Sequence, residues 1–182
     1  MSHLSCPLNI GQPPDTAAGL LVTLQSSIIP PRSAVTLRAG RLADVDELEA
    51  LEMHAFAHDR IARRSFVRFL TSSNASLIVV AGEGVLCGYA LVLFRTRSRL
   101  ARLYSIAVDA EHAGRQLGSS LLSAAEEAAY RRGSCAMRLE VRECNTAARI
   151  LYRKFGYDFV DRLFAYYADG SNALRLQKRL KK

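Results

Sequence analysis

A strand, a glycine-bearing loop, a long one-sided helix and a second strand follow one another in the middle of this chain. Leu103–Val108 predicts the first buried strand and Met137–Val141 the second. Between them apolar residues recur at helical spacing as far as Arg132, and Gly133 ends the predicted helix. A helical crossover between two strands of one sheet places them parallel. The unit therefore predicts an α/β fold.

Shorter elements on both sides complete the predicted sheet. Further strands are expected over Val35–Arg38, Leu77–Ala81, Tyr89–Phe94, Phe159–Tyr167 and Ala173–Gln177. Asp44 can cap a first helix that buries Leu48, Leu51 and Phe56, and further helices are expected over Ser65–Ser72 and Asn145–Phe155. The order β-α-α-β-β-β-α-β-α-β-β predicts a mixed central sheet flanked by helices.

The amino end differs from the rest of the chain in composition. All five prolines lie within residues 1–33, which we interpret as a flexible, proline-rich extension of a domain over residues 34–182. No apolar run is long enough to span a membrane and no secretion signal is present, so a cytoplasmic protein without a membrane partner is expected. The scattered cysteines, Cys6, Cys87, Cys135 and Cys144, predict reduced, buried thiols rather than disulfides or a zinc site.

The formal net charge of +8 favours acidic partners. A phosphate-rich cofactor, an acidic peptide and a ribonucleoprotein surface all remain open at this point.

Arg60, Arg63 and Arg64 could border a site for an acidic acceptor or form a solvated basic turn. The lysines at the carboxyl end predict a solvated tail, with no specific nucleic-acid binding expected. His54 and His58 could share a helix face, but two histidines without a carboxylate partner do not predict a metal site.

Two stretches contain residues suited to chemistry. After the strand that ends at Val108, loop amides and the first N–H groups of a helix converge around Gly114 and Gly118, which favours a phosphate or, equally, a tight turn. In the later strand Glu140 lies near the carboxyl end, where α/β sheets place ligands, although an ion pair with arginine is the favoured interpretation of Glu140 alone. Asn145 has the chemistry of a helix cap, and Tyr152 could be core.

Together these stretches resemble motifs A and B of the GNAT acetyltransferase superfamily, and more narrowly its ribosomal-protein alanine N-acetyltransferase (RimI-like) branch. The resemblance covers roughly Val35 to Lys178. It is carried by Leu139-Glu140-Val141-Arg142, Asn145-x-x-Ala148-x-x-Leu151-Tyr152, Phe155-Gly156-Tyr157 and Tyr166-Tyr167-x-Asp169-Gly170. It implies the GNAT fold, acetyl-CoA as co-substrate, and no metal. Relatives often pair through their last strands, so a homodimer is a further expectation.

The resemblance also implies a role for each matching residue. Glu140 corresponds to the general base and Tyr152 to the general acid. Acetyl-CoA is expected to bind the strand backbone, the pyrophosphate loop and the start of the next helix, at Ile106, Ala107, Val108, Gly114, Arg115, Gln116, Leu117, Gly118, Ser119 and Asn145. Ala113 and Gln116 depart from the family loop pattern Arg/Gln-x-x-Gly-x-Gly/Ala, which predicts weaker or altered cofactor affinity.

These roles suit acetyl transfer to an amine, which attacks only when neutral. At pH 7 an α-amine of pKa about 8 loses its proton at a cost of about 1.4 kcal/mol, against about 4.6 kcal/mol for lysine. A carboxylate can take that proton, and a tyrosine can protonate the departing thiolate. The expected acceptor is the N-terminal α-amine of a protein or peptide, such as a ribosomal protein. The alternatives are a small-molecule amine acetyltransferase and a non-catalytic acyl-CoA-binding module.

Overall fold

The computed structural model describes residues 35–56, 58–82 and 84–181; the predicted extension over residues 1–33 lies outside them. Seven strands form one sheet in the order β1-β2-β3-β4-β5-β7-β6. The strands are β1 (Val35–Ala39), β2 (Ala75–Gly82), β3 (Val85–Leu93), β4 (Leu100–Val108), β5 (Ala136–Arg142), β6 (Asp158–Leu163) and β7 (Ala173–Arg179). The helices are α1 (Val45–Ala55), α2 (Arg63–Thr71), α3 (Leu117–Arg131) and α4 (Thr146–Lys154). The mixed sheet and the predicted order of elements are confirmed.

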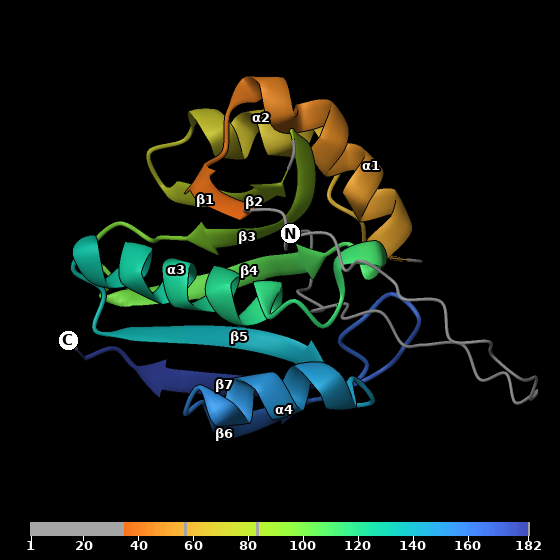
Figure 1. The fold of residues 1–182 in the computed structure, drawn as a ribbon. Helices are drawn as coiled ribbons and strands as arrows, with labels where there is room; N and C mark the ends of the chain where they lie inside the picture. Colours follow the sequence, from red (N-terminus) through yellow and green to blue (C-terminus); the bar gives the residue numbers. More distant parts are fainter. Residues whose placement is uncertain (1–34, 57, 83, 182) are drawn as a thin grey trace, which may run out of the picture.

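Helices cover the two faces of the sheet unequally (Figure 1). Alternation along the strands sends one set of apolar side chains toward α1 and α2 and the other toward α3 and α4. The cluster beneath α3 and α4 extends from β2 to β7. Within the described chain, the cluster beneath α1 and α2 includes residues of β2, β3 and β4 but none of β5, β6 or β7. The face of β5 and β7 on the α1 side is therefore left to polar side chains.

One predicted strand is shorter than expected. We predicted Phe159–Tyr167, but β6 ends at Leu163. The chain then turns, with Ala165 at a φ of 46° and the N–H groups of Tyr166 and Tyr167 both donating to the carbonyl of Ser171. Residues 164–172 consequently form a loop over the end of the sheet instead of continuing it.

Two details at the first helix also differ from expectation. Asp44 occupies the N-cap position of α1, but its carboxylate accepts two hydrogen bonds from Arg38, at 2.7 and 2.8 Å, instead of capping the helix. An opposite charge thus outcompetes the helix amides for this carboxylate. Phe56 is buried as expected, one residue beyond the end of α1. His58 also lies beyond that end, so His54 and His58 do not share a helix face.

Cys87, Cys135 and Cys144 are free thiols, as expected, but the expected burial is correct only for Cys87, and Cys6 lies outside the described residues. Cys87 is a buried free thiol, whereas Cys135 and Cys144 are free and exposed. Cys135 follows the turn that ends α3 and Cys144 precedes the cap of α4, so both lie in connections at the surface. None of the helices in the described ranges is long and apolar enough to cross a membrane.

Candidate active site

The two central strands separate after a short paired stretch. Parallel pairing joins Leu100–Arg102 of β4 to Ala136–Arg138 of β5, and the register of the described strands does not extend further. β4 nevertheless continues to Val108 and β5 to Arg142. Backbone groups of a central strand need hydrogen-bond partners. The gap between β4 and β5, which we call the splay, therefore offers β4 backbone groups to a ligand, including those of residues 106–108.

A β-bulge lies on β4 where the pairing with β5 stops. Leu91 of β3 pairs with Ser105 and Val92 pairs with Leu103, which leaves Tyr104 as an additional residue on β4. Bulges bend the strand that contains them and are frequent next to active sites. Beyond the bulge, Ala107 packs toward α1 and α2 while Ile106 packs toward α3 and α4. The splay is thus part of the architecture of this sheet.

The loop after β4 leads to the amino end of α3, at the mouth of the splay (Figure 1). Gly114 and Gln116 have positive φ values of 77° and 59°, and Gln116 is the N-cap. The N–H of Ser120 donates to the carbonyl of Gln116 at 3.0 Å, as the first turn of the helix requires. The N–H groups at residues 117–119 precede that bond, so they point out of the helix end where an anion can accept them. The predicted strand and loop residues are therefore brought to one place.

Gln116 is strained in this loop, because a left-handed backbone costs a residue with a side chain about 1–2 kcal/mol. Glycine removes that cost, but it loses more conformational entropy on folding, which costs roughly 0.5–1 kcal/mol of stability. We expect Gln116→Gly to raise the free energy of unfolding by about 0.5–1 kcal/mol in urea denaturation. Gln116→Ala is the matched control, since it removes the side chain and keeps the strain. Equal stabilities of the two variants would contradict the strain.

Glu140 lies on β5, two residues beyond the last pair with β4, and is only 2% exposed. Its Oε2 accepts from Nε of Arg102 on β4 at 2.9 Å, and its Oε1 accepts from Nε of Arg175 on β7 at 2.9 Å. The ion pair with arginine that the sequence favoured is thus present, in duplicate. Oε2 also lies 2.9 Å from Nη2 of Arg102, so both its lone pairs face that guanidinium. Oε1 has one arginine contact and can still accept a further hydrogen bond from a water or an amine.

Tyr152 lies on the other side of the sheet. Its fully buried side chain packs in the cluster that holds Ile106 of β4 and Leu139 of β5, edge-on to Tyr157 with ring centroids 5.7 Å apart. Asn145 caps α4, with its side-chain oxygen accepting from the N–H of Ala148 at 3.0 Å. The structure therefore places the predicted base, on β5, and the predicted acid, on α4, on opposite faces of the sheet that contains the splay.

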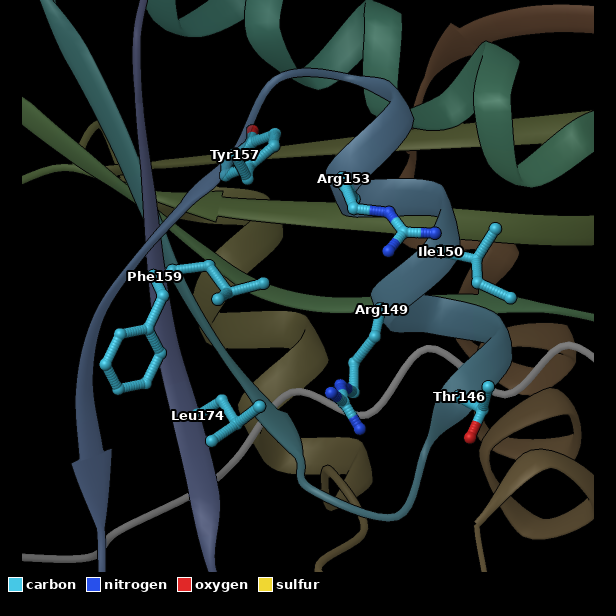
Figure 2. Close-up of a pocket in the computed structure, with 8 residues that line it drawn as sticks. Thr146, Arg149, Ile150, Arg153, Tyr157, Phe159 and Leu174 are labelled. Atoms are coloured by element: carbon cyan, nitrogen blue, oxygen red, sulfur yellow. The ribbon is translucent and has the colours of Figure 1, made fainter.

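Two hollows flank these strands. The larger, of about 850 Å³, opens on the face of Glu140 and is also lined by Arg102, Arg175 and Tyr166. The smaller, of about 550 Å³, lies between α4 and the last two strands, where Arg149 and Arg153 project from the helix (Figure 2). Its lining consists of Thr146, Arg149, Ile150, Arg153, Tyr157, Phe159, Leu174 and Leu176, without a carboxylate. Of these two, only the larger hollow gives an amine access to a candidate base.

Arg142, at the carboxyl end of β5, joins two loops beside the larger hollow. Its guanidinium donates to Asp59, in the α1–α2 connection, at 3.0 Å and to Asp169, in the β6–β7 loop, at 2.7 Å. It also stacks 3.9 Å from the centroid of the Tyr167 ring. Hydrogen bonds from Ser171, and then Arg142, lower the pKa of Asp169 to about 2. Sequence reasoning missed this bridge, although Arg142 alternates onto the same face as Glu140.

Of the three arginines predicted between the first two helices, Arg60 lies there and Arg63 and Arg64 begin α2. Arg63 forms ion pairs with Asp46 and with Glu49 of α1, and Arg60 donates to the carbonyl of Phe56. Arg63 is exposed, as a solvated charge would be, and its carboxylate partners lie on α1. The guanidinium groups available near Glu140 come instead from the strands.

A buried hydrogen-bond chain connects α1 to β4 and was also missed. Glu52, 1% exposed, accepts from the N–H of Ile61 at 2.6 Å and from the hydroxyl of Tyr89, whose oxygen lies 2.7 Å from Oγ of Ser105. Burial raises the pKa of Glu52 to about 7. The chain holds α1 and the following connection against the strand residue next to the bulge. The only sequence signal was a glutamate beside Leu51 on the apolar side of a helix.

Replacement of Glu52 with glutamine should change the pH dependence of stability. The pKa of Glu52 rises from 4.5 to about 7 on folding, so ionisation destabilises the folded state by roughly 3 kcal/mol. In the wild type, the stability contributed by protonated Glu52 is fully present below pH 4.5. It is lost as the pH rises through 7. Glu52→Gln should therefore be about 2–3 kcal/mol more stable than wild type at pH 8 and equal to it near pH 4.5. Urea denaturation across this range, with Glu49→Gln as control, checks the result, and a pH-independent difference would contradict it.

Comparison with known proteins places this site in a family. Residues 42–157 match the model of the acetyltransferase (GNAT) family. The N-alpha-acetyltransferase RimI of Mycobacterium tuberculosis is 32% identical over 148 residues, covering 79% of this chain and 92% of the relative. The ribosomal-protein-S18-alanine N-acetyltransferase of Escherichia coli superposes with a TM-score of 0.74 at 23% identity, covering 82% of this chain and 96% of that one. The yncA structure from Salmonella typhimurium, which holds its cofactor acetyl-CoA, gives a TM-score of 0.72 at 21% identity over 82% of this chain and 96% of its own. The chain therefore belongs to the GNAT acetyltransferase family, and it is an N-acetyltransferase.

Proposed function

We propose that this enzyme transfers the acetyl group of acetyl-CoA to the N-terminal α-amine of a protein or peptide, by direct transfer without an acyl-enzyme intermediate. The observation that carries the proposal is the splay, with the buried carboxylate of Glu140 on one face and Tyr152 on the other. An acyl donor in the splay is then reached by the acceptor from the side of Glu140. The CoA thiolate leaves on the opposite side, where Tyr152 lies.

Acetyl-CoA fits the groups around the splay. The N–H groups at residues 117–119 and the positive end of the α3 dipole suit the pyrophosphate. Gly114 and Arg115 in the preceding loop are exposed and can approach it. The backbone of residues 106–108 can hydrogen-bond the pantetheine arm and polarise the thioester carbonyl. The amide of Asn145 at the start of α4 adds a polar contact beside its capping bond.

The reaction needs two proton transfers. The amine nitrogen attacks the thioester carbon, and Glu140 accepts the amine proton directly or through one water. The carbon–sulfur bond breaks as the amide forms, and the CoA thiolate takes the hydroxyl proton of Tyr152. Proton exchange with water then restores both side chains. The two arginines fix the carboxylate in place and leave a lone pair on Oε1 for the incoming proton.

Two arguments favour an α-amine over a lysine or a small amine. An α-amine of pKa about 8 is deprotonated at neutral pH for about 3 kcal/mol less than a lysine. The relatives from Mycobacterium tuberculosis and Escherichia coli are named for N-alpha acetylation and for acetylation of a ribosomal-protein alanine, respectively. A ribosomal protein terminus is accordingly the first acceptor to test.

The test is release of free thiol from acetyl-CoA with a panel of acceptors. The panel contains ribosomal-protein N-terminal peptides, the same peptides capped at the amino end, lysine-bearing capped peptides, polyamines and aminoglycosides. We expect release with free-terminus peptides and none with capped ones. Release with polyamines or aminoglycosides alone would replace the proposal with a small-molecule acetyltransferase. Acetyl-CoA binding in calorimetry without release in any assay would favour a binding module.

A further inference from the structure

The hollow beside Glu140 is strongly basic. We call it the basic groove and define it by its charged lining: Arg95, Arg102, Arg138, Arg162, Arg175 and Glu140. It lies over the face of β5 and β7 that α1 and α2 do not cover, beside the end of β3 and the start of β4. Five guanidinium groups and one carboxylate line a single hollow, so its own lining leaves an excess of positive charge.

The surrounding fold neutralises only part of this charge. Arg102 and Arg175 share Glu140, and Arg162 donates to Glu143 at 2.6 Å. Arg138 donates to the side-chain oxygen of Gln177 at 2.8 and 3.1 Å, which is a neutral partner. In the described ranges, no carboxylate pairs with Arg138 or with Arg95. Two guanidinium charges of the groove therefore remain for an external anion.

The strand register concentrates this charge. Arg102 on β4 lies directly opposite Arg138 on β5, in the last pair before the splay. Like charges opposite one another destabilise a sheet. The carboxylate of Glu140, two residues further along the same face of β5, is held by Arg102 and Arg175, whereas Arg138 donates to Gln177. An anion in the groove would relieve the repulsion that this register creates.

We propose that the basic groove binds acidic side chains of the acceptor, specifically Asp or Glu at the second or third residue of the peptide. The spacing supports this position. Arg138 and Glu140 are two residues apart on one face of a strand, about 6.7 Å, which is also the distance spanned by two residues of an extended peptide. With the α-amine at Glu140, a carboxylate near the start of the peptide lies within reach of Arg138. The inference rests on the proposed function for the placement of the amine.

Equilibrium binding and turnover of matched peptides test this inference separately. Three fluorescent peptides share the first residue and differ only at positions two and three, which are both acidic (Glu), neutral (Gln) or basic (Lys). Fluorescence anisotropy with wild-type enzyme should show the acidic peptide binding about tenfold more tightly than the neutral one. Arg138→Gln should reduce that ratio to about two. Arg131→Gln removes the same charge from the exposed face of α3 and should leave the ratio unchanged.

The outcomes separate this inference from the proposed function. Acidic preference without turnover of any peptide supports the groove and overturns α-amine acetylation. Turnover with equal binding of acidic and neutral peptides, or with tighter binding of the basic one, overturns the groove alone. If Arg138→Gln does not fold, the wild-type ratio is measured at about 0.05 and about 0.5 M salt. A charge-based preference must shrink as salt rises, and a ratio independent of salt overturns the inference.

Discussion

Replacing Tyr152 with phenylalanine should lower kcat by about 10²–10⁴-fold, the usual contribution of a positioned general acid. The change removes only the hydroxyl. The ring, fully buried and packed edge-on against Tyr157, keeps its place in the cluster beneath α3 and α4. We therefore expect unchanged acetyl-CoA affinity in calorimetry and a large loss in the thiol-release assay.

Tyr157→Phe is the matched control for this variant. It removes a hydroxyl from the neighbouring buried ring of the same cluster, to which we assign no chemical role. We expect its kcat to stay within about twofold of wild type, since no proton transfer depends on it. Equal losses in both variants would mean that disturbed packing, and not a proton donor, explains the effect. If Tyr152→Phe turns over as fast as wild type, Tyr152 is not the general acid.

Replacing Arg142 with alanine should lower both stability and activity. The change leaves Asp59, whose side chain is 8% exposed, without its ion-pair partner and frees Asp169 from the end of β5. Removal of one partner of a mostly buried pair destabilises by several kcal/mol, and partial exposure of Asp169 reduces this to about 2–3 kcal/mol. The melting temperature should fall by about 4–12 °C. The peptide KM should rise more than the acetyl-CoA KM, because Tyr166 of the released β6–β7 loop lines the groove.

Arg149→Ala controls for the loss of a guanidinium near the same place. Arg149 is exposed on α4 and donates to the backbone carbonyl of Glu143 at 2.9 Å. Its removal should change the melting temperature by less than about 2 °C. Differential scanning fluorimetry with steady-state kinetics compares the two variants. If Arg142→Ala melts at the same temperature as wild type, or raises both KM values equally, the Arg142 bridge does not position the two loops.

The order of the elements could be predicted because each signal is local. The cap and stop of α4, Asn145 and Gly156, were read correctly, and Gly133 ends the helical region after α3 with a φ of 82°. Such signals depend on the backbone preferences of single residues and their near neighbours. The end of β6 was misjudged since apolar and aromatic residues continue to Tyr167, while the turn that removes them from the sheet depends on hydrogen bonds to Ser171.

The candidate site was only partly predictable. Motif spacing placed the α3 loop and Glu140 correctly at adjacent strand ends. The splay was not visible from residues alone, since it depends on the register of two strands about thirty residues apart and on a bulge at Tyr104. Arg102, Arg175 and Arg142 acquire their partners only when distant strands and loops meet. Pairing over such separations leaves no periodic trace in the sequence.

The central claim is that the acetyl group is delivered to an α-amine. The most direct measurement uses one peptide with a free amino terminus, an acidic second residue and a single internal lysine, incubated with enzyme and acetyl-CoA. Tandem mass spectrometry of the product then locates the added acetyl group. We predict a single acetyl group on the terminal nitrogen, absent when Tyr152→Phe replaces wild type over the same time. Acetylation of the lysine with a free terminus would contradict the account.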